Sequence, residues 1–363
     1  MSEGFPSQYC KSLTLLGHDT CLLYLSKQIK RIRRLRHSFG HNVIEVPIRG
    51  SRHLTSMLTA LEIVRTREFW ESDVIHTFNY YNPLVFFLTA IAKIMRKKIV
   101  VSSHFHPYLS GHKMKTRTML MIKATLEMAR HIVCINSEDM EWLRTEFRIN
   151  PSKLSMIPNG IDSEFYTPSD KTEARSLLRI DPLKKYVLCV SRLHPAKGQD
   201  VLLQAFRKVV NEVRDSVLVV VGTGSFGHEL RELCRDLGLG SKVNFTGFVI
   251  QETKRRWYQA SDVFVLPSLM EMFSLVVLEA MSSELPVVST KVSGWTQLSQ
   301  EREIGITVPI ADSDSLAAAI IRLLQNQSLR AKLGSAGRRL VLERYTWERM
   351  GEKLSDLFRQ IAL

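Results

Sequence analysis

The chain has 363 residues, of which 45% are hydrophobic and 24% charged, so it can build two domains with apolar cores and is not of the disordered class. Its five cysteines are scattered and form no C-x-x-C pair, which argues against a disulfide framework or a zinc site and favours a reducing, cytosolic setting. No N-terminal targeting signal is recognisable, and the most apolar run, residues 84–92, is far shorter than the roughly 20 residues of a membrane-spanning helix.

The net charge of +14 is unevenly distributed. Residues 1–150 carry 22 Lys and Arg against 12 Asp and Glu, a net charge of +10, whereas the remaining residues carry 28 against 24, a net charge of +4. The densest basic segment is residues 27–36, in which cations alternate with Ile29, Ile32 and Leu35. This spacing predicts a basic amphipathic helix that suits an anionic lipid surface or nucleic acid. The alternative is a solvated helix face. The cations concerned are Lys27, Lys30, Arg31, Arg33, Arg34 and Arg36.

In the first half of the chain, helices and strands alternate. Helices are predicted at 19–37, 55–70, 83–95, 112–129 and 138–147, and strands at 40–47, 73–78, 98–103, 132–136 and 153–158. Alternation of this kind predicts a doubly wound parallel sheet. Turn residues at Asn159-Gly160, followed by Pro168, place a domain boundary near residue 165. The first domain is therefore predicted to span residues 1–165.

A second alternating series follows. Strands are predicted at 187–191, 217–222, 243–247, 263–266, 287–290 and 306–309, with helices near 199–213, 227–238, 251–260, 274–283 and 313–326. The tail is helical in pattern, with a break near Tyr345-Thr346. We therefore expect a second domain over 166–345 and a final helix over 346–363 that could return to the first domain. The predicted fold class is α/β, with two Rossmann-like doubly wound domains facing a cleft.

Two carboxylates mark the most informative stretch, residues 262–290, which reads as a βαβ unit. Its helix is apolar nearly all round, so the charge of Glu279 within it needs a partner. Glu271 lies eight positions earlier, in the loop after the strand. Because ligands of open α/β sheets bind beyond the carboxyl ends of the strands, both acids can face one crevice. The alternative is that Glu271 is a solvated loop residue and that Glu279 caps the helix or pairs locally.

Two cations follow the first strand of the second domain. Arg192 and Lys197 lie in the loop between strand 187–191 and the next helix, where a helix N-terminus adds to an anion site suited to a diphosphate. The alternative is that both are ordinary solvated surface cations. A glycine loop that begins at Gly222 follows the next strand, but such turns are common and carry little information alone.

Six short motifs occur in one order over residues 187–290: S-R-L-x-x-x-K-G, G-T-G, T-G-F, D-V-F-V-L-P-S, E-x7-E and P-V-V-S-T. Together they resemble the family-4 retaining glycosyltransferases of the GT-B fold, and the similarity extends over about residues 40–350. The resemblance implies transfer of a hexose-type sugar from a nucleotide diphosphate sugar to an acceptor, with retained anomeric configuration.

The resemblance also implies roles for individual residues. Arg192 and Lys197 would hold the diphosphate, and Glu279 the ribose hydroxyls. Glu271 would hold the hydroxyls of the donor sugar, and His104, which follows strand 98–103, would contact the sugar and help to position the reacting centre. Further residues expected at the donor are Met272, Phe273, Ser274 and Leu275 near the phosphates and sugar, Gly247 and Phe248 near the base, and Gly222.

No obligatory cofactor or metal is expected, because cations and a helix end can meet the charge of a leaving diphosphate and no D-x-D pair is placed to hold a metal. His104, His106 and His112 lack a fourth ligand for zinc. The expected partners are a nucleotide diphosphate sugar, a lipid-linked or other glycan acceptor, and an anionic membrane surface on the cytosolic side. Nucleic acid is not expected, because the basic run lacks interleaved aromatic residues.

The sequence also departs from the family pattern. Residues 1–18 show no clear version of the usual opening strand and glycine-rich loop, and Met272 and Ser274 stand where glycines are usual. These departures keep open an alternative function, that of a non-catalytic relative that binds a nucleotide sugar or carbohydrate.

Overall fold

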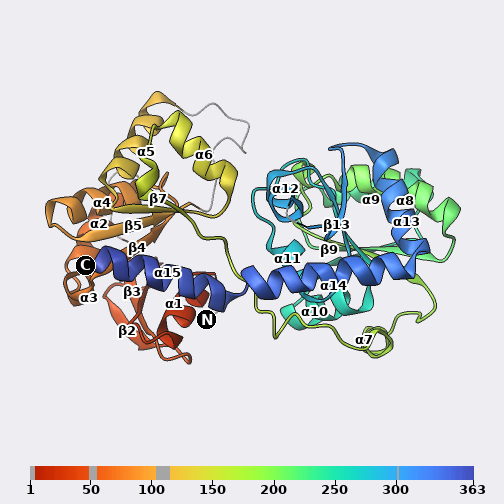
Figure 1. Ribbon diagram of the computed structural model, residues 1–363, viewed down its shortest axis with the longest axis horizontal. Helices are drawn as coiled ribbons and strands as arrows, with labels where there is room; N and C mark the ends of the chain where they lie inside the picture. Colours follow the sequence, from red (N-terminus) through yellow and green to blue (C-terminus); the bar gives the residue numbers. More distant parts are fainter. Residues whose placement is uncertain (1–4, 49–54, 104–114, 301) are drawn as a thin grey trace. The chain divides into compact units, whose positions relative to one another are not determined.

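The computed structural model describes residues 5–48, 55–103, 115–300 and 302–363 (Figure 1). The chain forms two compact units. Unit 1 comprises Met1–Asn159 and Trp347–Leu363, and unit 2 comprises Gly160–Thr346. The C-terminal helix α15 (Trp347–Ala362) is part of unit 1, because it packs against α1 (Phe5–Leu15) and against the strands of that unit.

Unit 1 contains two sets of paired strands. A parallel sheet has the order β4-β5-β6-β7, and a three-stranded sheet has the order β1-β3-β2, in which β1 and β3 are parallel and β2 is antiparallel. Residues from β3, α2, α4 and β5 share one apolar cluster, which joins the two sets into one core. The strands are β1 (Cys21–Ser26), β2 (Arg33–Arg36), β3 (Asn42–Pro47), β4 (Val74–Phe78), β5 (Lys98–Ser102), β6 (His131–Cys134) and β7 (Leu154–Met156). The further helices are α2 (Thr55–Val64), α3 (Arg67–Glu71), α4 (Pro83–Ile94), α5 (Thr116–Met128) and α6 (Ser137–Glu146).

The predicted helix at 19–37 is wrong. Residues 21–26 form β1 and residues 33–36 form β2, while the helix of this region is α1, earlier in the chain. The apolar residues at 29, 32 and 35 have a spacing typical of a helix, but pairing with β3 supplies the backbone hydrogen bonds, and that pairing involves residues distant in sequence. The basic segment is therefore a loop and an edge strand rather than an amphipathic helix. The predicted helix at 55–70 is also interrupted, because the hydroxyl of Thr66 accepts from Phe69 N and begins a separate helix, α3.

Unit 2 is a doubly wound sheet with the strand order β10-β9-β8-β11-β12-β13, parallel in every pair. Successive residues of β8 point to opposite faces: Val187 and Cys189 pack in one apolar cluster, and Leu188 and Val190 in another. Helices cover both faces, as predicted for strands that are apolar throughout. The strands are β8 (Lys185–Val190), β9 (Ser216–Val221), β10 (Val243–Gly247), β11 (Val263–Leu266), β12 (Val287–Thr290) and β13 (Gly305–Val308).

The predicted helices of this unit are confirmed, and two short ones were not predicted, α7 (Lys171–Leu177) and α12 (Ser293–Ser299). The confirmed helices are α8 (Gln199–Glu212), α9 (Gly227–Asp236), α10 (Gln251–Ala260), α11 (Leu275–Ser282), α13 (Ser313–Gln325) and α14 (Gln327–Arg344). The predicted break near Tyr345-Thr346 is present between α14 and α15.

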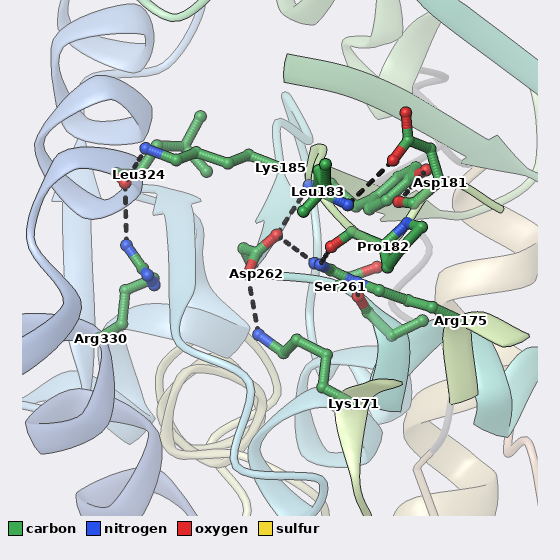
Figure 2. A network of polar contacts seen from close by, with 12 residues as sticks. Lys171, Arg175, Asp181, Pro182, Leu183, Lys185, Ser261, Asp262, Leu324 and Arg330 are labelled. Carbon is green, nitrogen blue, oxygen red and sulfur yellow. Dashed lines mark hydrogen bonds and ion pairs between the residues drawn. The ribbon is translucent and has the colours of Figure 1, made fainter. Parts of the chain in front are cut away.

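A buried carboxylate ties the amino ends of two central strands to α7 (Figure 2). Asp262, which precedes β11, accepts hydrogen bonds from Lys171 Nζ, Arg175 Nη2 and Tyr186 N, each at 2.8 Å. The Arg175 guanidinium also donates to two backbone carbonyls, those of Ala260 and Pro182. Every charge in this network is therefore paired, as a charge removed from water requires. It joins a helix that was not predicted to the end of the sheet opposite the loops that follow the strands.

Unit 1 buries a second carboxylate, that of Asp139 in α6, with no cation acting on it among the described residues. Burial raises its pKa to about 6, and the side chains of Ser103, Cys134 and Tyr80 around it offset only part of that effect. None of these hydroxyls makes a hydrogen bond of standard geometry to the carboxylate. The folded protein therefore binds a proton at Asp139 more tightly than the unfolded chain does, and the contribution of Asp139 to stability falls as the pH rises from 3.8 towards 6.

We predict that Asp139→Asn is more stable than the wild type at pH 7, by up to about 3 kcal/mol, because it removes a charge that is unfavourable only in the folded state. The difference in unfolding free energy should shrink as the pH is lowered from 6 to 4. For His76, which is partly buried and hydrogen-bonded to Ser102, the dependence on pH runs the other way, since burial lowers its pKa to about 3. Urea denaturation should therefore compare variant and wild type at each pH. A difference that does not change with pH would contradict the assignment to Asp139.

Candidate functional site

The order of strands in unit 2 places a crevice at one edge of the sheet. From β8 the chain adds β9 and β10 on one side, and later β11, β12 and β13 on the other, so β8 and β11 are neighbours from which connections leave in opposite directions. Ligands of open α/β sheets bind outside the carboxyl ends of the strands at such a point. Arg192 and Lys197 lie in the loop after β8, and Glu271 in the loop after β11.

A pocket of about 280 Å³ opens beside this point. Its lining residues are Val190, Ser191, Arg192, Val221, Gly222, Thr223, Phe248, Val249, Gln251 and Lys254. They come from the carboxyl ends of β8, β9 and β10 and from the start of α10. Three predicted donor-site residues, Arg192, Gly222 and Phe248, are therefore in one wall, and Gly247 is held there because its carbonyl accepts from Gly222 N at 2.9 Å.

The backbone of Arg192 is fixed by hydrogen bonding, while its side chain is exposed at the pocket. The buried amide of Gln199 donates to the Arg192 carbonyl and to Ser191 Oγ, both at 2.8 Å. Gln199 is the first residue of α8, whose N-terminus carries a partial positive charge. The loop thus presents a guanidinium on a fixed backbone next to a helix start, an arrangement that favours an anion.

Lys197 and Glu271 form an ion pair with Nζ and Oε2 2.6 Å apart. Their side chains are only 19% and 17% exposed, so the pair is largely screened from water. The interpretation of either residue as an ordinary solvated surface charge does not fit this burial. Neither residue lines the pocket itself, which ends at Arg192 on this side.

Glu279 lies on the buried helix α11 with 8% of its side chain exposed. The partner expected for its charge is present: Lys254 Nζ lies 2.7 Å from Oε1, and Tyr258 donates its hydroxyl to Oε2 at 2.7 Å. Burial, followed by the charge of Glu279, raises the pKa of Tyr258 well above its usual value, so this phenol remains a donor. Lys254 lies over the ring of Tyr166 and also lines the pocket, so it stands between the pocket and Glu279.

The remaining predicted residues have mixed outcomes. Met272, Phe273, Ser274 and Leu275 connect Glu271 to α11, and the side chains of Met272 and Ser274 are buried. They do not line the pocket. His104, His106 and His112 lie outside the described residues, so their predicted roles remain predictions. Within the described part of the chain, no group of three or more His, Cys, Asp and Glu is arranged to hold a metal ion.

Sequence reasoning missed the side chains that α10 contributes, Lys254, Tyr258 and Gln251. Gln251 lines the pocket, and its Oε1 accepts from the hydroxyl of Tyr166 at 2.8 Å. One signal was available, because residues four apart in a helix share a face, and Lys254 and Tyr258 have this spacing. Nothing in the sequence indicated which face of α10 packs against Glu279.

Comparisons with known proteins agree with this geometry. Residues 8–165 match the family described as Glycosyltransferase Family 4, and residues 170–340 match Glycosyl transferases group 1, so the two matches cover most of the chain. The chain belongs to the family-4 glycosyltransferases of the GT-B fold. In this glycosyltransferase family member, unit 1 corresponds to the first match and unit 2 to the second.

The individual relatives have low sequence identity to this chain. The chain is 30% identical, over 57% of its length, to the GDP-mannose-dependent alpha-(1-6)-phosphatidylinositol monomannoside mannosyltransferase of Mycobacterium tuberculosis, and it spans only 56% of that relative. Among solved structures it resembles a sucrose-phosphate synthase from Thermosynechococcus elongatus, with a TM-score of 0.79 and 23% identity over 98% of this chain and 92% of that one. It also resembles Anabaena HepE in complex with UDP-glucose, with a TM-score of 0.72 and 22% identity over 88% of this chain and 86% of that one. The structural likeness supports the fold.

We predict that Lys254→Met destabilises the protein by about 3 to 5 kcal/mol, because it leaves the buried charge of Glu279 without its cation. Adding Glu279→Gln should restore much of the loss, which a double-mutant cycle by urea denaturation measures. Lys332→Met is the matched control, since its pair with Glu303 is exposed to solvent and should contribute little to stability. Equal losses for the two lysine variants would contradict the importance of the buried pair.

Proposed function

We propose that the protein is a retaining glycosyltransferase that moves a hexose-type sugar from a nucleotide diphosphate sugar to an acceptor. The observation that carries the proposal is the pocket at the carboxyl edge of the unit 2 sheet, which Arg192 and Lys254 help to line. Beside it, the carboxylates of Glu271 and Glu279 are each paired with a lysine. A relative named as GDP-mannose-dependent and a structural neighbour bound to UDP-glucose support this class of donor.

The pocket fits the parts of such a donor in order. Phe248 and Val249 offer apolar surface for a base, and Arg192 offers a guanidinium for the phosphates. Glu279, which lies behind Lys254 rather than in the pocket lining, would accept from the ribose hydroxyls, and Lys254 and Tyr258 hold its carboxylate in one orientation. Glu271 would accept from hydroxyls of the sugar.

The reaction requires stabilisation of a leaving nucleoside diphosphate, on which negative charge grows as the glycosidic bond breaks. Fixed cations act best when they are in place before that charge develops. Arg192 and Lys197 come from one loop whose backbone is pinned by Gln199 and by the start of α8. Because these side chains can balance the charge, the proposal requires no metal ion or other cofactor.

The acceptor is proposed to be lipid-linked, at the cytosolic membrane face. One relative is named for phosphatidylinositol monomannoside, which is a lipid. No helix of the described residues has both the length and the hydrophobicity to span a bilayer. In unit 1 the segment 27–36 exposes Lys27, Arg31 and Arg33, and the neighbouring Leu25 and Leu35 are 40% and 41% exposed. A combination of cations and apolar side chains at the surface suits an anionic bilayer.

The alternative is a relative that binds a nucleotide sugar without turning it over. The specific observation in its favour is that the first described element is the helix α1, whereas the family resemblance leads us to expect a strand and a glycine-rich loop. Binding and turnover must therefore be measured separately.

We expect one of the UDP-, GDP- or ADP-sugars to stabilise the protein against heat, by about 2.7 kcal/mol at a hundredfold its Kd. Arg192→Met should weaken nucleoside diphosphate binding and lower kcat by about 10² to 10³, because it removes a fixed donor to the leaving group. Arg235→Met, an exposed arginine on α9, is the control. Tight binding without hydrolysis or transfer would favour the non-catalytic alternative, and stabilisation by none of the donors would refute the proposal.

For the membrane, we expect triple substitution of Lys27, Arg31 and Arg33 by Gln to reduce cosedimentation with anionic liposomes about a hundredfold, at about 1 kcal/mol for each cation. Arg34→Gln is the matched control in the same segment. Its guanidinium is already paired with Glu68, with Nε and Oε1 2.7 Å apart, so its removal should change liposome binding less. If the triple variant binds liposomes as the wild type does, the basic segment is not the attachment surface.

A further inference from the structure

The Lys197–Glu271 ion pair joins two groups to which the proposed function gives separate tasks, one towards the phosphates and one towards the sugar. With Nζ and Oε2 2.6 Å apart, each neutralises the other. Within the part of the chain that the structure describes, Glu271 makes one further hydrogen bond, in which its backbone carbonyl accepts from Gly294 N at 3.0 Å. Both groups are therefore engaged with each other in this structure.

The backbones on both sides of the pair are fixed. Gly198 follows Lys197 with φ +63, and a Cβ there would lie 2.1 Å from the carbonyl oxygen of Pro267, so the two loops touch main chain to main chain. A Cβ on Gly294 would lie 2.7 Å from the carbonyl oxygen of Met272, which holds the Glu271 loop against α12 in the same way. A change of partner must therefore come from rotation of the two side chains rather than from movement of the loops.

The second lysine–glutamate pair, Lys254 and Glu279, makes more contacts with neighbouring side chains. Glu279 is held by both Lys254 and Tyr258, and Lys254 also lies over the ring of Tyr166. Among the described residues, the side chains of Lys197 and Glu271 make polar contacts only with each other, and the pair is about twice as exposed on the glutamate side, 17% against 8%. The pair beside the proposed sugar position is thus the one that can separate.

We infer that the donor diphosphate exchanges partners with this ion pair: it takes the ammonium of Lys197, and only then is the carboxylate of Glu271 free to accept hydrogen bonds from sugar hydroxyls. The inference rests on the proposed function. A diphosphate ester carries two negative charges, and a phosphate oxygen competes for an ammonium on equal terms with a carboxylate. The Glu271 carboxylate is then left without a cation in a largely buried position, and sugar hydroxyls supply the donors it lacks.

The exchange has a consequence for specificity. A free sugar meets a Glu271 that is already neutralised, whereas a sugar joined to a diphosphate releases the acceptor that binds it. The site therefore selects sugars that arrive on a diphosphate, and Glu271 opposes the binding of the bare diphosphate by holding Lys197.

Titration calorimetry with inorganic pyrophosphate, and with UDP, GDP and ADP, tests this on the full chain. Glu271→Gln should bind pyrophosphate and the preferred nucleoside diphosphate about two- to fivefold more tightly than the wild type, since no carboxylate competes for Lys197. Lys197→Met should bind them more weakly. In the double variant Lys197→Met/Glu271→Gln, the gain from the glutamate substitution should disappear, because the cation it releases is absent.

The double variant separates exchange from simple repulsion. If Glu271→Gln gains affinity to the same extent with and without Lys197, the carboxylate merely repels anions and the exchange is wrong. A Glu271→Gln variant that binds pyrophosphate no more tightly than the wild type also overturns it, while leaving the donor site intact. If the wild type binds neither pyrophosphate nor any of the three nucleotides, the proposed function itself fails. Thermal melts of each variant confirm that the comparison is made on folded protein.

Discussion

The buried carboxylate of Glu279 imposes the strictest requirement on unit 2. It lies on a helix whose other residues, apart from Ser282 at the end, are apolar, and an unpaired charge there would cost several kcal/mol (about 3 to 5 when a partner is removed). Lys254 and Tyr258 meet the requirement from α10, which fixes α10 against α11. The same contact reaches the pocket, since Lys254 is one of the residues that line it. On the proposed function, stability and ligand recognition thus depend on one set of side chains.

The sequence predicted the structure best where a feature depends only on one strand and the loop that follows it. The apolar strands of unit 2 and the residues after them, Arg192, Lys197 and Glu271, follow from local pattern and from the rule that parallel strands end at one edge. The prediction that Glu279 needs a partner was also confirmed. The identity of the partner was not predictable, because it depends on how α10 is rotated against α11, and packing rather than sequence spacing decides that.

The N-terminal region shows the opposite case. Local spacing there favours a helix over 19–37, whereas β1 and β2 form because β3 pairs with both. Long-range pairing overrides local preference, and a single sequence carries little sign of it. This difference bears on the proposed membrane surface, because the predicted basic helix includes an edge strand on which Arg34 is already neutralised by Glu68. Charged residues also protect an exposed strand edge from pairing with other chains, so the same cations serve the fold.

The two ends of the unit 2 sheet differ: one carries a closed polar network, and the other carries the loops around the pocket. At the amino ends of β8 and β11, Asp262 joins a lysine, an arginine and a backbone amide into a closed network. At the carboxyl ends, charged side chains extend from short loops around the pocket. Substitutions in those loops can therefore alter recognition while the opposite end maintains the sheet, which is how one α/β scaffold accommodates many ligands.

The path of the chain through unit 1 has a consequence for biosynthesis. Helix α1 packs on α15, so a part of the first unit leaves the ribosome only after all of unit 2. Unit 2, by contrast, is one continuous segment. Its two ends lie side by side, because Ile161 N donates to the carbonyl of Tyr345. During translation the inner unit can reach its native state first, and the outer one must wait with Tyr9 and Leu13 uncovered until Leu354 and its neighbours emerge. An interval with such exposed apolar surface is when a nascent chain of this topology most needs a chaperone.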